Sequence, residues 1–174
     1  MAELGTRAVR GGTSPEAVGE VIALLRRLND GGSGVTHLMT GPRADPRAVA
    51  ARISGPSAGI DVVIETSGST TGQGRLVGLT ARALFSSATA TLARLGGPGQ
   101  WLTSLPVHHV AGLQVLTRSV VAALDPVVWE GTGPESFADA ARQLRRGVPH
   151  YLSLVPTQLV RLLSSDPGAL SRFS

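Results

Sequence analysis

The chain contains neither lysine nor cysteine. All sixteen of its basic residues are arginines, so a lysine nucleophile, a Schiff base or a phosphate-binding ammonium group would have to come from elsewhere. The missing cysteines exclude disulfides and thiolate metal sites, and they leave the redox compartment open. Long apolar runs are missing as well, because nowhere do about eighteen apolar residues follow one another. Residues 1–12 have no hydrophobic signal segment. We therefore expect a cytoplasmic protein without a membrane span.

Aromatic residues are also scarce, at 3% of the sequence, so leucine, valine and alanine must build most of the core. With 174 residues, 42% of them hydrophobic, the chain has the size and composition of one globular domain. Its arginines are scattered among apolar helical positions instead of forming a basic stripe with interleaved aromatic residues. Nucleic-acid binding is therefore not expected.

Short apolar runs alternate with stretches of helical periodicity along the chain. Strands are expected at 35–39, 60–64, 101–105, 126–129 and 151–155, and helices at 15–28, 46–53, 80–95, 112–124, 134–146 and 157–163. This alternation predicts an α/β architecture, with a layered, largely parallel sheet flanked by helices. Residues 1–59 are expected to be a helical and loop region of the same domain, and residues 60–174 its phosphate-loop portion.

Ligands of such folds collect beyond the carboxyl ends of the strands, which directs attention to loops 65–75, 106–112 and 155–157. The first of these loops is a run of small hydroxyl residues and glycines. Glycines let backbone N–H groups turn toward a common point, and hydroxyls add further donors, so we expect an anion such as a polyphosphate there. A helix is expected to follow. The candidate phosphate ligands are Thr66, Ser67, Gly68, Ser69, Thr70, Thr71, Gly72 and Arg75.

Two other known patterns are also rich in glycine. The first loop is not a P-loop, because no lysine follows its glycines, although its composition also fits a flexible linker. Residues 55–59 match the G-x-S-x-G pattern of serine hydrolases. That pattern needs a strand before it and a helix after it, and here the order is reversed. Residues 55–59 are therefore expected to form a turn.

The second loop contains two adjacent histidines, His108 and His109, between a strand and a helix. Neighbouring residues in an extended loop point in opposite directions, so one histidine can face a ligand while the other packs or reaches solvent. No third or fourth ligand is spaced to complete a metal site with them. A histidine in a loop is usually unremarkable, but the phosphate-type loop two elements upstream favours a function.

Three motifs in this order resemble those of the adenylate-forming acyl-CoA synthetases. They are Thr66-Ser67-Gly68-Ser69-Thr70-Thr71-Gly72 with Arg75, Pro106-Val107-His108-His109-Val110-Ala111-Gly112-Leu113, and Leu154-Val155-Pro156-Thr157-Gln158-Leu159. The second and third motifs most resemble those of the o-succinylbenzoate–CoA ligases of menaquinone biosynthesis. The resemblance covers residues 60–163 well and the first 59 residues loosely.

The resemblance implies an AMP-forming acid–CoA ligase. A carboxylate attacks the α-phosphate of ATP to give an acyl-adenylate and pyrophosphate, and the thiol of coenzyme A then displaces AMP. The first loop would hold the phosphates, and His109 would be the catalytic histidine that positions the substrate carboxylate. The residues implied to bind the aryl carboxylate substrate are His108, His109, Gly112, Ser153, Pro156 and Thr157.

The chain also departs from the family it resembles. The first loop has one extra residue, and Gln73-Gly74-Arg75 replaces the usual x-Pro-Lys. The family's adenine and Mg²⁺ motif, its ribose-binding aspartate, its hinge and its lysine-bearing C-terminal domain have no counterpart before Ser174. Mg²⁺ ligands are therefore not expected in this chain. The isolated chain is expected to be inactive and to associate with a complementary C-terminal half or with itself. A non-catalytic remnant that keeps the scaffold, or an unrelated α/β protein binding another phosphate, are the alternatives.

Overall fold

The computed structural model describes residues 6–31, 34–54, 58–66, 74–131 and 133–174. Strands and helices alternate along most of this part of the chain. Their order is β1 (Thr6–Arg10), α1 (Pro15–Asn29), β2 (Thr36–Thr40), α2 (Pro46–Ala50), β3 (Val62–Glu65), β4 (Leu76–Leu79), α3 (Ala81–Arg94), β5 (Gln100–Thr103), α4 (Val110–Ala122), β6 (Val127–Val128), α5 (Pro134–Arg142), β7 (His150–Leu152) and α6 (Pro156–Ser165).

The strands form two separate sheets. The first has the order β1-β2-β3-β4, in which β1, β2 and β3 are parallel and β4 runs antiparallel to β3. The second has the order β6-β5-β7, and all of its strands are parallel. The predicted α/β class with largely parallel strands is thus confirmed, although the strands divide between two sheets instead of joining one.

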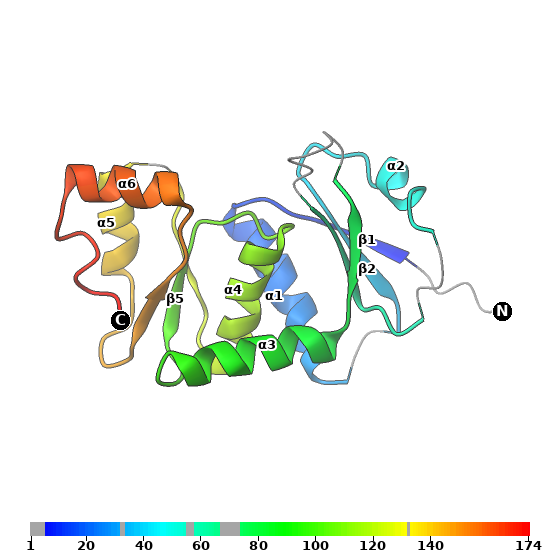
Figure 1. Ribbon diagram of the computed structural model, residues 1–174, viewed down its shortest axis with the longest axis horizontal. Coiled ribbons are helices and arrows are strands. Elements are labelled where there is room, and N and C mark those ends of the chain that lie inside the picture. Colours follow the sequence, from blue (N-terminus) through cyan, green and yellow to red (C-terminus); the bar gives the residue numbers. More distant parts are fainter. Residues whose placement is uncertain (1–5, 32–33, 55–57, 67–73, 132) are drawn as a thin grey trace.

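Helices and sheets are stacked in alternating layers (Figure 1). Helix α2 covers one face of the first sheet, where Val49 packs against Leu38 and Val63. Helices α1, α3 and α4 cover its other face and form the largest apolar cluster of the chain with β1, β2 and β3. Helix α4 also packs against β5, while α5 and α6 cover the far side of the second sheet. Helix α4 therefore lies between the two sheets and belongs to both cores.

Local sequence signals explain where several helices begin. The Ser14 hydroxyl accepts a hydrogen bond from the Ala17 N–H at 3.3 Å, and Pro15 takes the first helical position of α1. Thr80 caps α3 in the same way, with its hydroxyl 3.0 Å from the Ala83 nitrogen. These two starts are the predicted ones, because a short polar side chain satisfies a backbone donor that the helix itself leaves unpaired.

Two strands were not expected from the sequence. Residues 6–10 form β1, which pairs with β2 over five residues, so the region 1–59 supplies two strands to the first sheet. Residues 76–79 form β4, which separates the first loop from helix α3. The helix predicted after the loop therefore begins only at Ala81, beyond a whole strand. No helix in the described part of the chain is long and apolar enough to cross a membrane.

Candidate functional site

The ends of the first loop are held together by the β3 and β4 hairpin. The Thr66 N–H donates to the Arg75 carbonyl at 2.9 Å, and the Arg75 N–H donates to the Thr66 hydroxyl at 2.9 Å. Both residues are exposed at the carboxyl end of β3. The other predicted phosphate ligands, Ser67, Gly68, Ser69, Thr70, Thr71 and Gly72, lie outside the described residues. Thr66 and Arg75 thus mark where the predicted phosphate loop leaves the sheet.

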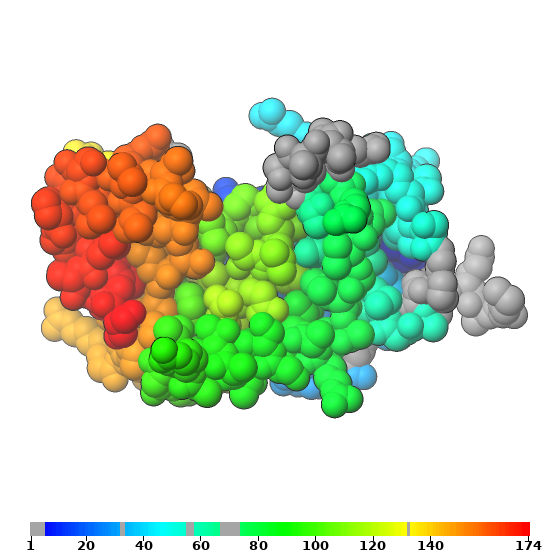
Figure 2. All heavy atoms as spheres, in the orientation of Figure 1, coloured from blue at the N-terminus to red at the C-terminus, as the bar shows by residue number. Residues whose placement is uncertain are grey.

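The second loop connects the two sheets at their carboxyl ends. The Val107 N–H donates to the carbonyl of Gly12, just after β1, at 2.9 Å. Val107 itself is fully buried in the core around α1 and α4. On the other side, the Gln158 side-chain amide donates to the Ser104 hydroxyl at 3.3 Å, which joins the first turn of α6 to the residue that follows β5. In the space-filling view the surface dips above α4, between α6 and the β4 side of the hairpin (Figure 2).

The two histidines of the second loop have different surroundings. A Cβ atom on Gly11 would lie 2.5 Å from the His108 Cβ, and one on Gly41 would lie 3.5 Å from its Nε2. The His108 side chain therefore packs against Gly11 and Gly41, which follow β1 and β2. It lines a surface hollow of about 410 Å³ together with Gly12, Thr13, Ser14, Pro42 and Pro106. Burial is the main cause, and the neighbouring His109 a further one, of a pKa of His108 below the usual value.

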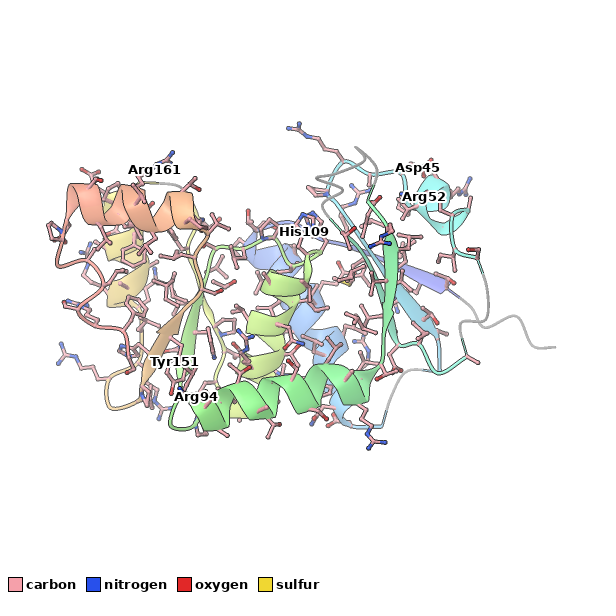
Figure 3. The ribbon with its side chains drawn as sticks, in the orientation of Figure 1. Asp45, Arg52, Arg94, His109, Tyr151 and Arg161 are labelled. Atoms are coloured by element: carbon pink, nitrogen blue, oxygen red, sulfur yellow. The ribbon has the colours of Figure 1, made fainter. Side chains whose placement is uncertain are left out.

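His109 occupies the N-cap position of α4 with extended backbone angles, and its side chain makes no capping hydrogen bond. Its ring centre lies 4.3 Å from that of His108. Figure 3 places His109 at the upper end of α4, next to the first sheet. A ring at a helix N-terminus, where unpaired N–H groups favour negative charge, is well placed to meet an anionic group.

The remaining predicted substrate residues lie on α4 and in the third loop. Gly112 is buried in the first turn of α4, where a Cβ would lie 2.3 Å from the Pro106 carbonyl oxygen. Ser153 is partly buried, and Pro156 and Thr157 are exposed at the start of α6. The Gln158 side chain of α6 donates to Ser104, which follows β5, so the bond joins the segments next to the second and third loops. Gln158 belongs to the third motif, but its hydrogen bond to Ser104 was not predicted from the sequence.

A polar layer between α4 and β5 was missed by the sequence analysis. Trp101 and Thr103 lie two residues apart on β5, and Gln114 and Arg118 lie four residues apart on α4, so each pair shares a face. The Arg118 guanidinium carbon lies 5.0 Å from the centre of the Trp101 ring, within the range of a cation–π contact. The signal available in the sequence was a glutamine and an arginine four residues apart within a mostly apolar helix.

The polar atoms of this layer lack partners among the described residues. They are the Trp101 Nε1, the Thr103 hydroxyl, the Gln114 Oε1 and the Arg118 Nε, all buried. Burial also lowers the pKa of Arg118. Buried polar groups are nearly always hydrogen-bonded, so these four atoms leave hydrogen-bonding capacity between α4 and β5 for water or a polar ligand to satisfy. Among the described residues there is no group of three acidic, histidine or cysteine side chains able to hold a metal ion.

No protein-family model matches the chain. A probable 2-succinylbenzoate–CoA ligase of Mycobacterium tuberculosis H37Rv is 45% identical over 113 residues, which cover 63% of this chain and 29% of that protein. O-succinylbenzoate coenzyme A synthetase from Bacillus subtilis, in complex with AMP, superimposes with a TM-score of 0.67 at 18% identity over 92% of this chain and 51% of its own.

A second structure of the Bacillus subtilis synthetase, in complex with ATP and magnesium ion, gives a TM-score of 0.64 at 17% identity over 91% of this chain and 52% of its own. The chain therefore has the fold of about half of these solved synthetases. Its resemblance to the succinylbenzoate–CoA ligases, predicted from three motifs, is confirmed. The chain spans less than a third of the length of this curated relative and about half that of the solved synthetases.

Two histidines are expected to make the stability of this ligase-like fold depend on pH. Burial, as the largest cause, lowers the pKa of both His37 and His108, although the Asp61 carbonyl opposes it at His37. Both side chains therefore stay neutral in the fold at a pH where they are protonated in the unfolded chain. The unfolding free energy should be at its full value above about pH 6.5 and fall as the pH drops through the lowered values.

Urea unfolding at about pH 7.5 and about pH 5 measures this effect, and the midpoint should be lower in acid. The variant His108→Asn should lose part of the difference, because asparagine does not titrate. A pH dependence equal to that of the wild type in His108→Asn would contradict the burial of His108.

Proposed function

We propose that the chain is the part of an AMP-forming 2-succinylbenzoate–CoA ligase that binds the acid and the phosphates of ATP. The observation that carries the proposal is the unpartnered polar layer of α4 and β5, which shares helix α4 with His109 at its N-terminus. The similarity to ligases of this specificity supports it.

The substrate that the site would accept is an acid with two carboxylates. In the proposed reaction one carboxylate oxygen attacks the α-phosphorus of ATP and pyrophosphate leaves, after which the coenzyme A thiol displaces AMP from the acyl-adenylate. Thr66 and Arg75 would contact the departing phosphates, and His109 would orient the attacking carboxylate. Mg²⁺ would neutralise phosphate charge, with ligands supplied outside the described residues.

Arg118 would bind the second carboxylate. Residues 109 and 118 are separated by about 13 Å along the helix axis, at about 1.5 Å per residue. Helical side chains lean toward the N-terminus, so the Arg118 guanidinium comes closer to His109 than its backbone does. A planar guanidinium can bind a carboxylate through two parallel hydrogen bonds. Gln114, one turn nearer to His109, has its side-chain oxygen in the same layer.

We further propose that the rest of a ligase docks on α6 and the open edge of β7. Val155, Leu159 and Leu163 form an exposed apolar stripe at four-residue spacing, and Val160 is 64% exposed beside it. At the edge of the second sheet, the Ser174 N–H donates to the His150 carbonyl at 3.0 Å. Strand β7 lies at the edge of the second sheet. Uncovered apolar surface and an open strand edge both favour association.

Arg118→Met is expected to weaken binding of 2-succinylbenzoate to the purified chain by about tenfold to a hundredfold. The reason is the loss of charge-assisted hydrogen bonds in a partly buried layer, with most of the side-chain volume retained. Isothermal titration measures the two dissociation constants. An analogue of the acid without its ring carboxylate should bind the wild type and the variant equally weakly.

Arg94→Met is the matched control. Arg94 is an exposed arginine in the last turn of α3, and the same change there should leave the affinity unaltered. Unchanged binding by Arg118→Met, or an equal loss in both variants, would show that Arg118 does not recognise the acid.

A further inference from the structure

Arg52 touches both ends of the first loop. Its Nη1 donates to the Glu65 carboxylate at 2.6 Å, where the loop begins, and its Nη2 donates to the carbonyl of Gly74, where the loop ends. Arg52 lies in the turn that follows α2, outside both strands of the hairpin. One guanidinium therefore connects the residues that enter and leave the loop. Figure 3 shows Arg52 beside α2, next to the first sheet.

This contact differs from an ordinary surface ion pair. The Arg52 and Glu65 side chains are only 32% and 33% exposed, whereas exposed pairs contribute little because water competes for both charges. The neighbouring backbone is also tightly packed. A Cβ on Gly74 would lie 2.0 Å from the Thr66 carbonyl oxygen and 2.6 Å from the Glu65 Cγ. The two ends can approach this closely only with glycine at position 74.

The Arg52 contacts add to the hydrogen bonds between the two ends. Thr66 and Arg75 exchange two bonds, so the last rung of the hairpin lies directly beneath the loop. Arg52 stabilises this pair through its contacts with the preceding residues, Glu65 and Gly74. Two donors of one rigid plane fix the separation of their acceptors, which a flexible ammonium group with a single nitrogen cannot do.

We propose that Arg52 is a positioning residue, which holds Thr66 and Arg75 at the separation that phosphate binding requires. This inference rests on the proposed function, because it assigns Thr66 and Arg75 a phosphate group as their ligand. Arg52 itself does not contact the phosphates. Its effect is to fix the direction of Thr66 and Arg75 before a ligand arrives, so that less ordering is needed on binding.

Two measurements on the full chain test the proposal. Hydrogen exchange of the Thr66 amide, without ligand, reports how firmly the two ends are joined. Titration with pyrophosphate, followed by amide resonances, reports binding. In Arg52→Met we expect exchange of the Thr66 amide to rise about tenfold and the pyrophosphate dissociation constant to rise about fivefold to fiftyfold, while the melting temperature changes little. A purely structural role would instead lower the melting temperature and affect exchange throughout the first sheet.

Three variants sharpen the result. Arg52→Lys keeps the charge but not the fork, so it should recover less than half of the loss in binding. Glu65→Gln removes the ion pair at the opposite side and should raise the exchange of the Thr66 amide even if Arg52→Met does not fold. Arg47→Met, an exposed arginine on α2, is the control and should behave as the wild type.

The outcomes separate this inference from the proposed function. Wild-type exchange and affinity in Arg52→Met, or full recovery in Arg52→Lys, would overturn the role of Arg52. If the wild-type chain does not bind pyrophosphate, the phosphate site fails, and the positioning role fails with it. In that case, faster exchange of the Thr66 amide in Arg52→Met would show only that Arg52 stabilises the hairpin.

Discussion

Gly112→Val is expected to lower the unfolding free energy by about 3 kcal/mol or more. A Cβ at this position would lie 2.3 Å from the Pro106 carbonyl oxygen, 2.7 Å from the carbonyl carbon and 2.8 Å from the Leu105 oxygen. These are backbone atoms, so the clash cannot be relieved by turning a side chain, and the whole second loop must move. Urea unfolding followed by circular dichroism measures the loss.

The matched control is Gly19→Ala in helix α1. Nothing lies within 4 Å of a Cβ built at Gly19, which is exposed in the middle of the helix. This change should raise the unfolding free energy by about 0.5 to 1 kcal/mol, because alanine loses less backbone entropy than glycine. If Gly112→Val were as stable as the wild type, the second loop could not pack against α4 as described.

Purified residues 1–174 are expected to show no ATP–pyrophosphate exchange with 2-succinylbenzoate. Adenylation in ligases of this kind depends on groups from several segments, and such sets lose activity far more than proportionally when members are missing. The chain has no lysine to approach the α-phosphate. Exchange clearly above that of Gly68→Val, which blocks backbone approach in the first loop, would refute the proposal that the chain is one part of the enzyme.

Activity should appear when the chain is mixed with the portion of the Mycobacterium tuberculosis ligase that it does not match. Leu159→Asp should abolish this recovery, because a carboxylate would enter the apolar stripe of α6. Ser164→Asp places the same charge on an exposed position of the same helix and is the control. Recovery with Leu159→Asp at the wild-type level would exclude α6 as the docking surface.

The parts of the fold that the sequence predicts are those with local causes. The start of α1 follows from Ser14 and Pro15, and that of α3 from Thr80, since each signal acts within one helical turn. Strand β4 was missed because Leu76–Leu79 is short, includes a glycine and pairs only through a hairpin. Strand β1 was missed because it contains two arginines and is stabilised by β2, about thirty residues away.

The candidate site divides in the same way. Motifs drew attention to His109 and Gly112, and the structure places both at the N-terminal end of α4. Arg52 was not predicted because nothing in its neighbouring sequence distinguishes it from other arginines, and Arg118 because its spacing from Gln114 does not by itself indicate a site. Their significance lies in contacts with Glu65, Gly74 and Trp101, which are 13 to 22 residues away. Only the folded chain brings such groups together.

The position of α4 between the sheets has a consequence for synthesis on the ribosome. The last strand of the first sheet ends at Leu79, and the helices α1 and α3 both lie within residues 15–94. Its core nevertheless includes Val107, Leu113 and Leu116, which emerge later. A nascent chain that ends before α4 would expose the apolar surface that these residues cover, and so be a target for chaperones. Emergence of α4 from the ribosome is thus the step that closes the first core and provides a surface for the second.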